Sequence, residues 1–297
     1  MRAKRIRHKI PPFESLFTIE NLYTAWHKVA LGRFKKRPIQ EFYFNLDKNL
    51  CSLVNDLREG LYKPGSYNRF LVYDPKERII AAAPVRDRVV QHALINYYDH
   101  VFDRHLIYDS YACRVNKGTH KAILRAFHYA KGNKVSSNSR YFLKMDVRKY
   151  FDSIDHETLK SKLSKIILDT KILQLFELII DSADGYSNKG IPIGNLTSQY
   201  FANFYLSSFD HYCKEFCKAG KYIRYMDDII IFSNDKESID YFHSKAVTYM
   251  EKHLKLTLKP KITGKMPGKG LPALRRKHLE FPARRRPERK YSPQGCL

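Results

Sequence analysis

The segment 222–233, with the sequence YIRYMDDIIIFS, constrains the fold of this chain more than any other stretch. Two adjacent carboxylates, Asp227 and Asp228, stand between two short runs of β-branched and aromatic residues, which is typical of a β-hairpin with acids at its turn. Holding two carboxylates side by side on an apolar hairpin is costly unless a cation offsets their charge. Because carboxylate oxygens suit hard cations, the pattern predicts a site for Mg²⁺, with Mn²⁺ as a substitute, rather than for zinc.

A third acid should approach this pair from another strand, and Asp146 is the candidate, since it ends the strand-like run YFLKMD at 141–146. A single Asp is more often a turn residue or a helix cap, so the prediction depends on all three contexts together. Two metal ions about 4 Å apart can activate the attacking oxygen and stabilise the leaving oxygen in phosphoryl transfer. We therefore expect Asp146 and Asp227 to bind metal, Asp228 to support the site, and the backbone carbonyl of Val147 to add a ligand.

The charge of the chain favours a polyanionic partner. Its 297 residues include 54 Lys and Arg against 30 Asp and Glu, a net charge of +24, so nucleic acid is a better candidate than an acidic membrane surface. A basic protein without such a partner is the alternative. We expect no membrane span, because no run of about 18 apolar residues occurs. Residues 1–10 are basic but lack the apolar run of a secretory signal, and five cysteines without paired spacing suggest a reducing compartment.

Hydrophobic periodicity and turn residues predict an α+β chain in four parts. Residues 1–60 form a helical extension, 61–140 a mixed region, and 141–263 a region around the acidic hairpin. Residues 264–297 carry five prolines and ten Lys and Arg against two Glu, which predicts an irregular basic tail. The expected elements are two helices over 13–60 broken near 35–38, strands over 67–82 turning at Asp74-Pro75, helices at 86–106, 119–131, 171–184, 198–218 and 236–253, a strand at 141–146, the hairpin at 222–233, and a helix with Asp155 as its N-cap.

Six segments resemble the conserved blocks of reverse transcriptases, in the order in which that family has them. The tetrapeptide Tyr225-Met-Asp-Asp228 matches the family's signature, and the ordered set is far more specific than this tetrapeptide alone. The segments are RIIAAAPVRDRVVQH at 78–92, SYACRVNKGTHKA at 110–122, the block at 142–156 that contains Asp146, the block at 190–203 that begins GIPIGNLTSQ, YMDD at 225–228, and LKLTLKPK at 254–261.

The resemblance implies the fingers and palm of a right-hand polymerase, with fingers at 61–140 and a palm at 141–263 built on a small antiparallel sheet. It implies an RNA-directed DNA polymerase that uses two metal ions for nucleotidyl transfer. Its partners would be template RNA, the RNA–DNA hybrid and deoxynucleoside triphosphates (dNTPs). Its location would be the cytoplasm of a bacterium, with the gene carried by the bacterium or a phage.

The resemblance also suggests roles for individual residues. Phe151 lies five residues after Asp146, where the family places a bulky side chain that excludes the 2′-hydroxyl of a ribonucleotide, with a core residue as the alternative. Arg78 is the candidate cation for the incoming triphosphate. Lys259 and Lys261 are candidates for a phosphate contact or for the proton donor, with a solvated charged face as the alternative.

Two departures from the common pattern are informative. Many reverse transcriptases have Pro-Gln-Gly where this chain has Pro192-Ile193-Gly194, and Ser-Pro where it has Ser198-Gln199. The form seen here resembles the enzymes of diversity-generating retroelements, which copy a template-repeat RNA into cDNA with errors opposite adenine and work with a small basic accessory protein. The resemblance therefore adds Ile193, Gly194 and Gln199 to the nucleotide-binding candidates. A retron or group II intron-like enzyme is the alternative.

The second departure follows Lys261, where we find neither the block that grips the primer nor a helical thumb. We therefore expect the thumb to be missing or truncated, through truncation or a frame shift. A genuine basic RNA-binding arm is the alternative for the tail, and a catalytically silent RNA-binding protein is the alternative for the chain.

Overall fold

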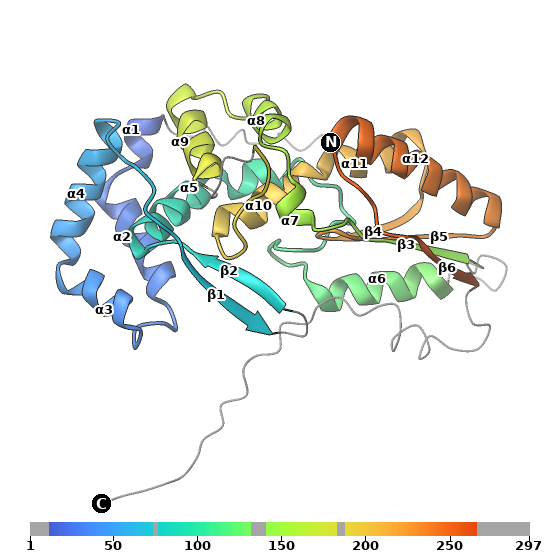
Figure 1. The fold of residues 1–297 in the computed structure, drawn as a ribbon, viewed down its shortest axis with the longest axis horizontal. Coiled ribbons are helices and arrows are strands. Elements are labelled where there is room, and N and C mark those ends of the chain that lie inside the picture. Colours follow the sequence, from blue (N-terminus) through green and yellow to red (C-terminus); the bar gives the residue numbers. More distant parts are fainter. Residues whose placement is uncertain (1–11, 74–76, 132–140, 183–187, 266–297) are drawn as a thin grey trace, which may run out of the picture.

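The computed structural model describes residues 12–73, 77–131, 141–182 and 188–265. Helices and strands are mixed, and every strand pair in the described part is antiparallel, which confirms the α+β class (Figure 1). A separate hairpin consists of β1 (Asn68–Tyr73) and β2 (Glu77–Ala82), as predicted. The main sheet has the order β4-β5-β3-β6 and comprises β3 (Tyr141–Met145), β4 (Lys221–Tyr225), β5 (Asp228–Ser233) and β6 (Ile262–Lys265).

Helices cover both faces of the main sheet. The helix α12 (Lys236–Leu254) packs on β3 and β5, and α6 (Thr119–Lys131) packs on β4 from the opposite side (Figure 1). The run Ile229–Phe232 in β5 is therefore buried throughout, since neither face of that strand meets water. Both helices and the hairpin around 226–227 lie where the sequence predicts them.

The N-terminal region contains four helices instead of the two that we expected over 13–60. Thr18 starts a new helix, because its hydroxyl accepts a hydrogen bond from the Asn21 amide at 3.3 Å. The predicted break near 35–38 is confirmed, and Pro38 lies in the first turn of the next helix, where it costs no hydrogen bond. The four helices are α1 (Phe13–Leu16), α2 (Ile19–Ala30), α3 (Arg37–Phe44) and α4 (Leu46–Arg58), and α5 (Val85–Asp103) packs against the first three.

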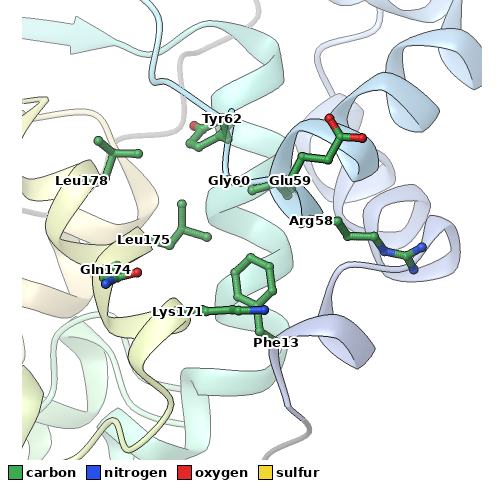
Figure 2. Close-up of a pocket in the computed structure, with 10 residues that line it drawn as sticks. Phe13, Arg58, Glu59, Gly60, Tyr62, Lys171, Gln174, Leu175 and Leu178 are labelled. Atoms are coloured by element: carbon green, nitrogen blue, oxygen red, sulfur yellow. The ribbon is translucent and has the colours of Figure 1, made fainter.

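These N-terminal helices meet α9 (Thr170–Asp181) around a cavity of about 410 Å³, into which Phe13 and Leu175 project from opposite walls (Figure 2). The Phe13 amide donates to Asp169 at 3.1 Å, and Lys171 forms an ion pair with Glu14 at 2.6 Å. The N-terminal region is thereby joined to the region that carries the acids.

The prediction of one continuous helix over 198–218 is wrong. The chain forms α10 (Leu196–Tyr205), α11 (Ser207–His211) and a π-helical turn at Tyr212–Phe216. Apolar periodicity runs through all three segments, and it does not reveal where the hydrogen-bond pattern changes. The predicted N-cap is confirmed, because the Asp155 carboxylate accepts from the Thr158 amide at 2.9 Å at the start of α8 (His156–Ser164); the short helix α7 (Tyr150–Ser153) precedes it.

Strand β6 was not predicted. It pairs with β3 from Tyr141↔Lys265 to Lys144↔Ile262, so residues 264 and 265, which we assigned to the irregular tail, belong to the sheet. Some predictions lie outside the described residues. They concern the turn at 74–75, the end of the expected helix at 183–184, and the tail from 266, including the predicted loss of the thumb. No helix in the described part has both the length and the apolar character needed to cross a membrane.

Candidate active site

The acidic hairpin turns through two residues, Met226 and Asp227, between the paired Tyr225 and Asp228. Met226 has a φ of +53°, in the left-handed region that is unfavourable for a bulky side chain. Such strain persists only where surrounding contacts hold it. The Arg224 guanidinium supplies one of them, because it donates to the Met226 carbonyl at 2.9 Å.

Arg224 is completely buried, and it bonds both oxygens of the buried Asp210 at 2.7 Å each. It also donates to the side-chain oxygen of Asn203 at 3.0 Å, while the Tyr222 hydroxyl donates to Asp210 at 2.6 Å. A buried ion pair with its remaining hydrogen-bonding groups satisfied is rigid. The turn is therefore tied to α10 and α11 by a network in the core.

Asp146 directly follows β3, and the pairing Met145↔Ile229 brings the end of β3 to the start of β5, next to the turn. The segment after α12 fixes this position from the other side, since the Arg148 amide donates to Thr257 and the Lys259 amide donates to the Asp146 carbonyl, both at 2.8 Å. The Lys259 ammonium contacts the Asp146 carboxylate at 2.7 Å.

The charges of the three acids are only partly neutralised. Burial raises the pKa of Asp227 to about 6, and the neighbouring charges of Asp228 and Asp146 add to the shift. Burial also raises the pKa of Asp228, although Lys144, 3.3 Å away, opposes the change. One buried oxygen of Asp146 has no hydrogen-bond partner. The three acids are therefore not fully neutralised by the neighbouring lysines, and an added cation would stabilise them.

The donor set fits a hard divalent cation, because it offers carboxylate oxygens and an orphaned buried oxygen without thiol or imidazole groups. Within the described ranges, no three Asp, Glu, His or Cys side chains converge closely enough to enclose one ion. Lys259 and Lys144 contact the carboxylates instead. Val147 is buried and pairs with Leu258 in an isolated bridge, which fixes its backbone beside Asp146.

The loop before α10 lies against the β1–β2 hairpin. The Ala81 amide donates to the Ile193 carbonyl at 2.8 Å. Gly194 has a φ of +130°, and a Cβ there would lie 2.7 Å from the Ala81 carbonyl oxygen, so only glycine fits. Ile193, Ala81 and Arg69 line a cavity of about 220 Å³ together with Asp152.

The other predicted nucleotide-binding residues are more dispersed. Arg78 is exposed on β2 and alternates with Ile79, which faces the cavity, so Arg78 points to the other face of the hairpin. Phe151 is half-buried, and its carbonyl accepts from the Ile191 amide at 2.9 Å, beside the Ile193 loop. Gln199 accepts a hydrogen bond from Cys113. Lys261 forms an ion pair with Asp240 of α12 at 2.7 Å instead of contacting the three acids.

The family model described as reverse transcriptase (RNA-dependent DNA polymerase) matches residues 63–263, which include the three acids and the strands that carry them. The chain belongs to this family. Protein YkfC of Escherichia coli K12 is 26% identical over 179 residues, covering 57% of this chain and 46% of YkfC. The Retron Ec83 reverse transcriptase of Escherichia coli is 30% identical over 122 residues, 39% of each chain.

The group II intron-encoded protein LtrA of Lactococcus lactis is 24% identical over 180 residues, covering 56% of this chain and 28% of LtrA. The reverse transcriptase chain thus spans less than half the length of these curated relatives. Among solved structures, apo telomerase from Candida tropicalis has a TM-score of 0.49 and 12% identity, covering 75% of this chain and 49% of telomerase, a similarity too low to support any argument about function.

Three residues of the candidate site were not predicted from the sequence. Lys144 contacts the Asp228 carboxylate at 3.3 Å. Arg69 lines the cavity beside Ile193, and Arg224 supports the turn. A signal for Arg224 does exist, because a charged residue inside a strand that is otherwise buried must have a charged or strongly polar partner. Its partner, Asp210, could not be named from sequence, because the choice among nearby acids depends on how α11 is oriented.

Proposed function

We propose that this chain is an RNA-directed DNA polymerase, with a palm at 141–263, fingers at 61–140 and a helical extension at 1–60. The observation that carries the proposal is the position of Asp146, Asp227 and Asp228 at one end of the main sheet, where the charges of Asp228 and Asp146 add to the raised pKa of the buried Asp227. Reverse transcriptase relatives among retron and group II intron proteins support the same reaction class.

In this proposal Asp146, Asp227 and the Val147 carbonyl would hold two Mg²⁺ ions, or Mn²⁺ in their place, which neutralise the triphosphate and acidify the primer hydroxyl when bound. Asp228 adds a negative charge beside Asp227, and the Lys144 ammonium, 3.3 Å away, partly neutralises the Asp228 carboxylate. Lys259, whose ammonium contacts the Asp146 carboxylate at 2.7 Å, would donate a proton to the leaving pyrophosphate oxygen. Lys261 would at most contact phosphates at the edge of the site, because it forms an ion pair with Asp240.

Nucleotide selection would depend on the fingers hairpin and the Ile193 loop. Phe151 would exclude a 2′-hydroxyl by its bulk. Arg78 points away from the Ile193 cavity, so it would reach the triphosphate only from the other face of the β1–β2 hairpin. Gly194 permits the close contact of β2 with this loop, and Gln199 completes the candidate nucleotide site from α10. The template RNA, the RNA–DNA hybrid and dNTPs are the proposed ligands.

Among subtypes we propose the diversity-generating kind, which copies a template-repeat RNA with errors and uses a small basic accessory protein. The support is Ile193, which is an aliphatic side chain at a position where many reverse transcriptases have the amide of a Gln. Loss of one hydrogen bond to the nucleotide would weaken discrimination between correct and incorrect nucleotides by about 1–3 kcal/mol. Sequencing cDNA from wild type and Ile193→Gln tests this, with fewer errors at template adenines expected in the variant. An unchanged error spectrum would instead favour a retron or group II intron-like enzyme.

The reaction itself is tested by primer extension on an RNA template with Mg²⁺ and dNTPs. Extension by wild type that is lost in Asp227→Ala supports the proposal. Tight RNA binding without extension by wild type, under conditions in which a known reverse transcriptase extends the same primer, favours the silent RNA-binding protein.

A further inference from the structure

A groove of about 490 Å³ lies along α6, on the side of β4 opposite α12. Its walls come from the first half of α6 and from the loop that precedes this helix. The proposed mechanism uses none of its side chains. The groove is lined by Tyr108, Lys117, Lys121, Leu124, Arg125 and His128, among others.

The groove has a surplus of positive charge. Lys121 and Arg125 lie one turn apart on α6, and Lys117 lies in the loop just before it; all three line the groove, where their like charges repel. Asp109 is the buried carboxylate of this region, and it is already engaged by Arg125 at 2.9 Å and by Lys214 at 3.4 Å. Lys121 is exposed and forms no ion pair with any described residue. An anionic ligand would relieve this repulsion.

The groove also presents an aromatic ring to solvent. Tyr108 is 70% exposed, and the Lys117 ammonium lies 3.4 Å from the centre of its ring. Leu124 is 67% exposed on the same wall. An exposed ring flanked by cations and an apolar side chain is the combination by which proteins stack an unpaired base and hold the adjoining phosphates.

The loop that carries Tyr108 is held in place. The Lys117 ammonium donates to the Tyr108 carbonyl at 2.8 Å, and Asn116 adopts a left-handed φ of +59°. Thr119, at the start of α6, donates to the Tyr225 hydroxyl at 3.1 Å, so the groove is linked to the acidic hairpin by one hydrogen bond. The helix that forms one wall of the groove is therefore bonded to the end of β4, next to the acidic hairpin.

We propose that this groove binds an unpaired segment of nucleic acid, with one base against Tyr108 and the adjoining phosphates on Lys117 and Lys121. A duplex does not satisfy the site, because its bases are already stacked and cannot reach the ring. The site would anchor a single strand next to the hairpin whether or not synthesis takes place. The side chains fit RNA and DNA equally, so the experiment includes both.

The test compares two double variants of the full chain by fluorescence anisotropy with 12-nucleotide RNA, 12-nucleotide DNA and an RNA duplex, without Mg²⁺ or dNTPs. Tyr108→Leu/Lys121→Gln removes the ring and the unpaired cation of the groove. Tyr241→Leu/Lys245→Gln is the matched control, because Lys245 also lies over an exposed tyrosine ring, at 5.5 Å, on α12. Single-nucleotide extension of a preformed hybrid serves to show that the active site of each variant is intact.

We expect the groove variant to lose about 5- to 150-fold in single-strand affinity, the equivalent of one stacked base, and the control less than twofold. Lys121→Gln alone, at an exposed position that cannot disturb folding, should lower the salt dependence of binding by about 0.7 in log–log slope. Loss on RNA alone would support the site and identify RNA as its ligand. Equal losses in groove and control variants, or an equal loss for the duplex, would overturn the proposal.

Discussion

Asp227→Asn should make the metal-free protein more stable at neutral pH. Asp227 has a pKa of about 6 in the folded protein against an ordinary value of 3.8, because the fold buries it beside two other acids. Between these two values the folded state retains a proton that the unfolded state has lost. The contribution of this group to stability therefore falls as the pH rises from about 4 to 6, and it stays low above that range.

The size of the effect follows from the shift. A difference of about two pKa units corresponds to about 3 kcal/mol, which is the upper limit for the gain of Asp227→Asn at pH 7.5. At pH 4 the wild-type carboxyl is mostly protonated in the folded state, so the two proteins should differ by less than about 1 kcal/mol. Mg²⁺ should stabilise wild type more than the variant, because it supplies the charge that the cluster lacks.

Urea unfolding at pH 4.0, 5.0 and 7.5, with EDTA or with Mg²⁺, measures this difference. Asp47→Asn is the matched control, because Asp47 is exposed in the first turn of α4, where loss of its charge should cost at most about 1 kcal/mol and should not respond to Mg²⁺. A difference between wild type and Asp227→Asn that does not change with pH, or that Mg²⁺ leaves unaltered, would refute the reasoning about repulsion among the acids.

Three further predictions concern the framework around these acids. Arg224→Met should cost about 3–5 kcal/mol in urea unfolding, because it leaves Asp210 buried without its cation, and adding Asp210→Leu should recover part of this loss. Gly194→Ala should cost about 1–3 kcal/mol, because a side chain there meets a backbone carbonyl at a strained φ; an unchanged unfolding midpoint would mean that β2 can move away. Lys259→Ala should lower kcat for extension by about 10²- to 10⁴-fold if it donates the proton, while Lys261→Ala should change kcat little; similar effects of both would refute the distinction between them.

Features that depend on neighbouring residues were predictable from the sequence. The hairpin at 222–233 is one, because two acids interrupt an apolar run and leave room for a two-residue turn. The helix at 119–131 and the Asp155 cap are others, since periodicity and capping act within a few residues. Each of the three acids also has a recognisable local context, since Asp146 directly follows a strand, Asp227 lies in the turn and Asp228 begins a strand.

Features that depend on distant pairing were not predictable. The strand β6 has the sequence ITGK, which carries no alternating pattern, and it forms because β3, more than 100 residues earlier, has an open edge. The opposite directions of Arg78 and Ile79 on β2 follow from strand alternation, but which of them faces the Ile193 loop depends on how the hairpin docks. The Arg224–Asp210 pair likewise requires the orientation of a helix that periodicity does not specify.

The most direct test of the central claim is incorporation of one labelled dNTP onto a DNA primer annealed to RNA, by wild type, Asp146→Asn and Asp47→Asn in parallel. Asp146→Asn removes one charge at the end of β3 and keeps the shape of the side chain, and Asp47→Asn makes the same change on an exposed helix. We expect Mg²⁺-dependent incorporation by wild type and Asp47→Asn, and a loss of at least about 10³-fold in Asp146→Asn. Incorporation by Asp146→Asn at the wild-type rate would contradict the assignment of the three acids as the catalytic centre.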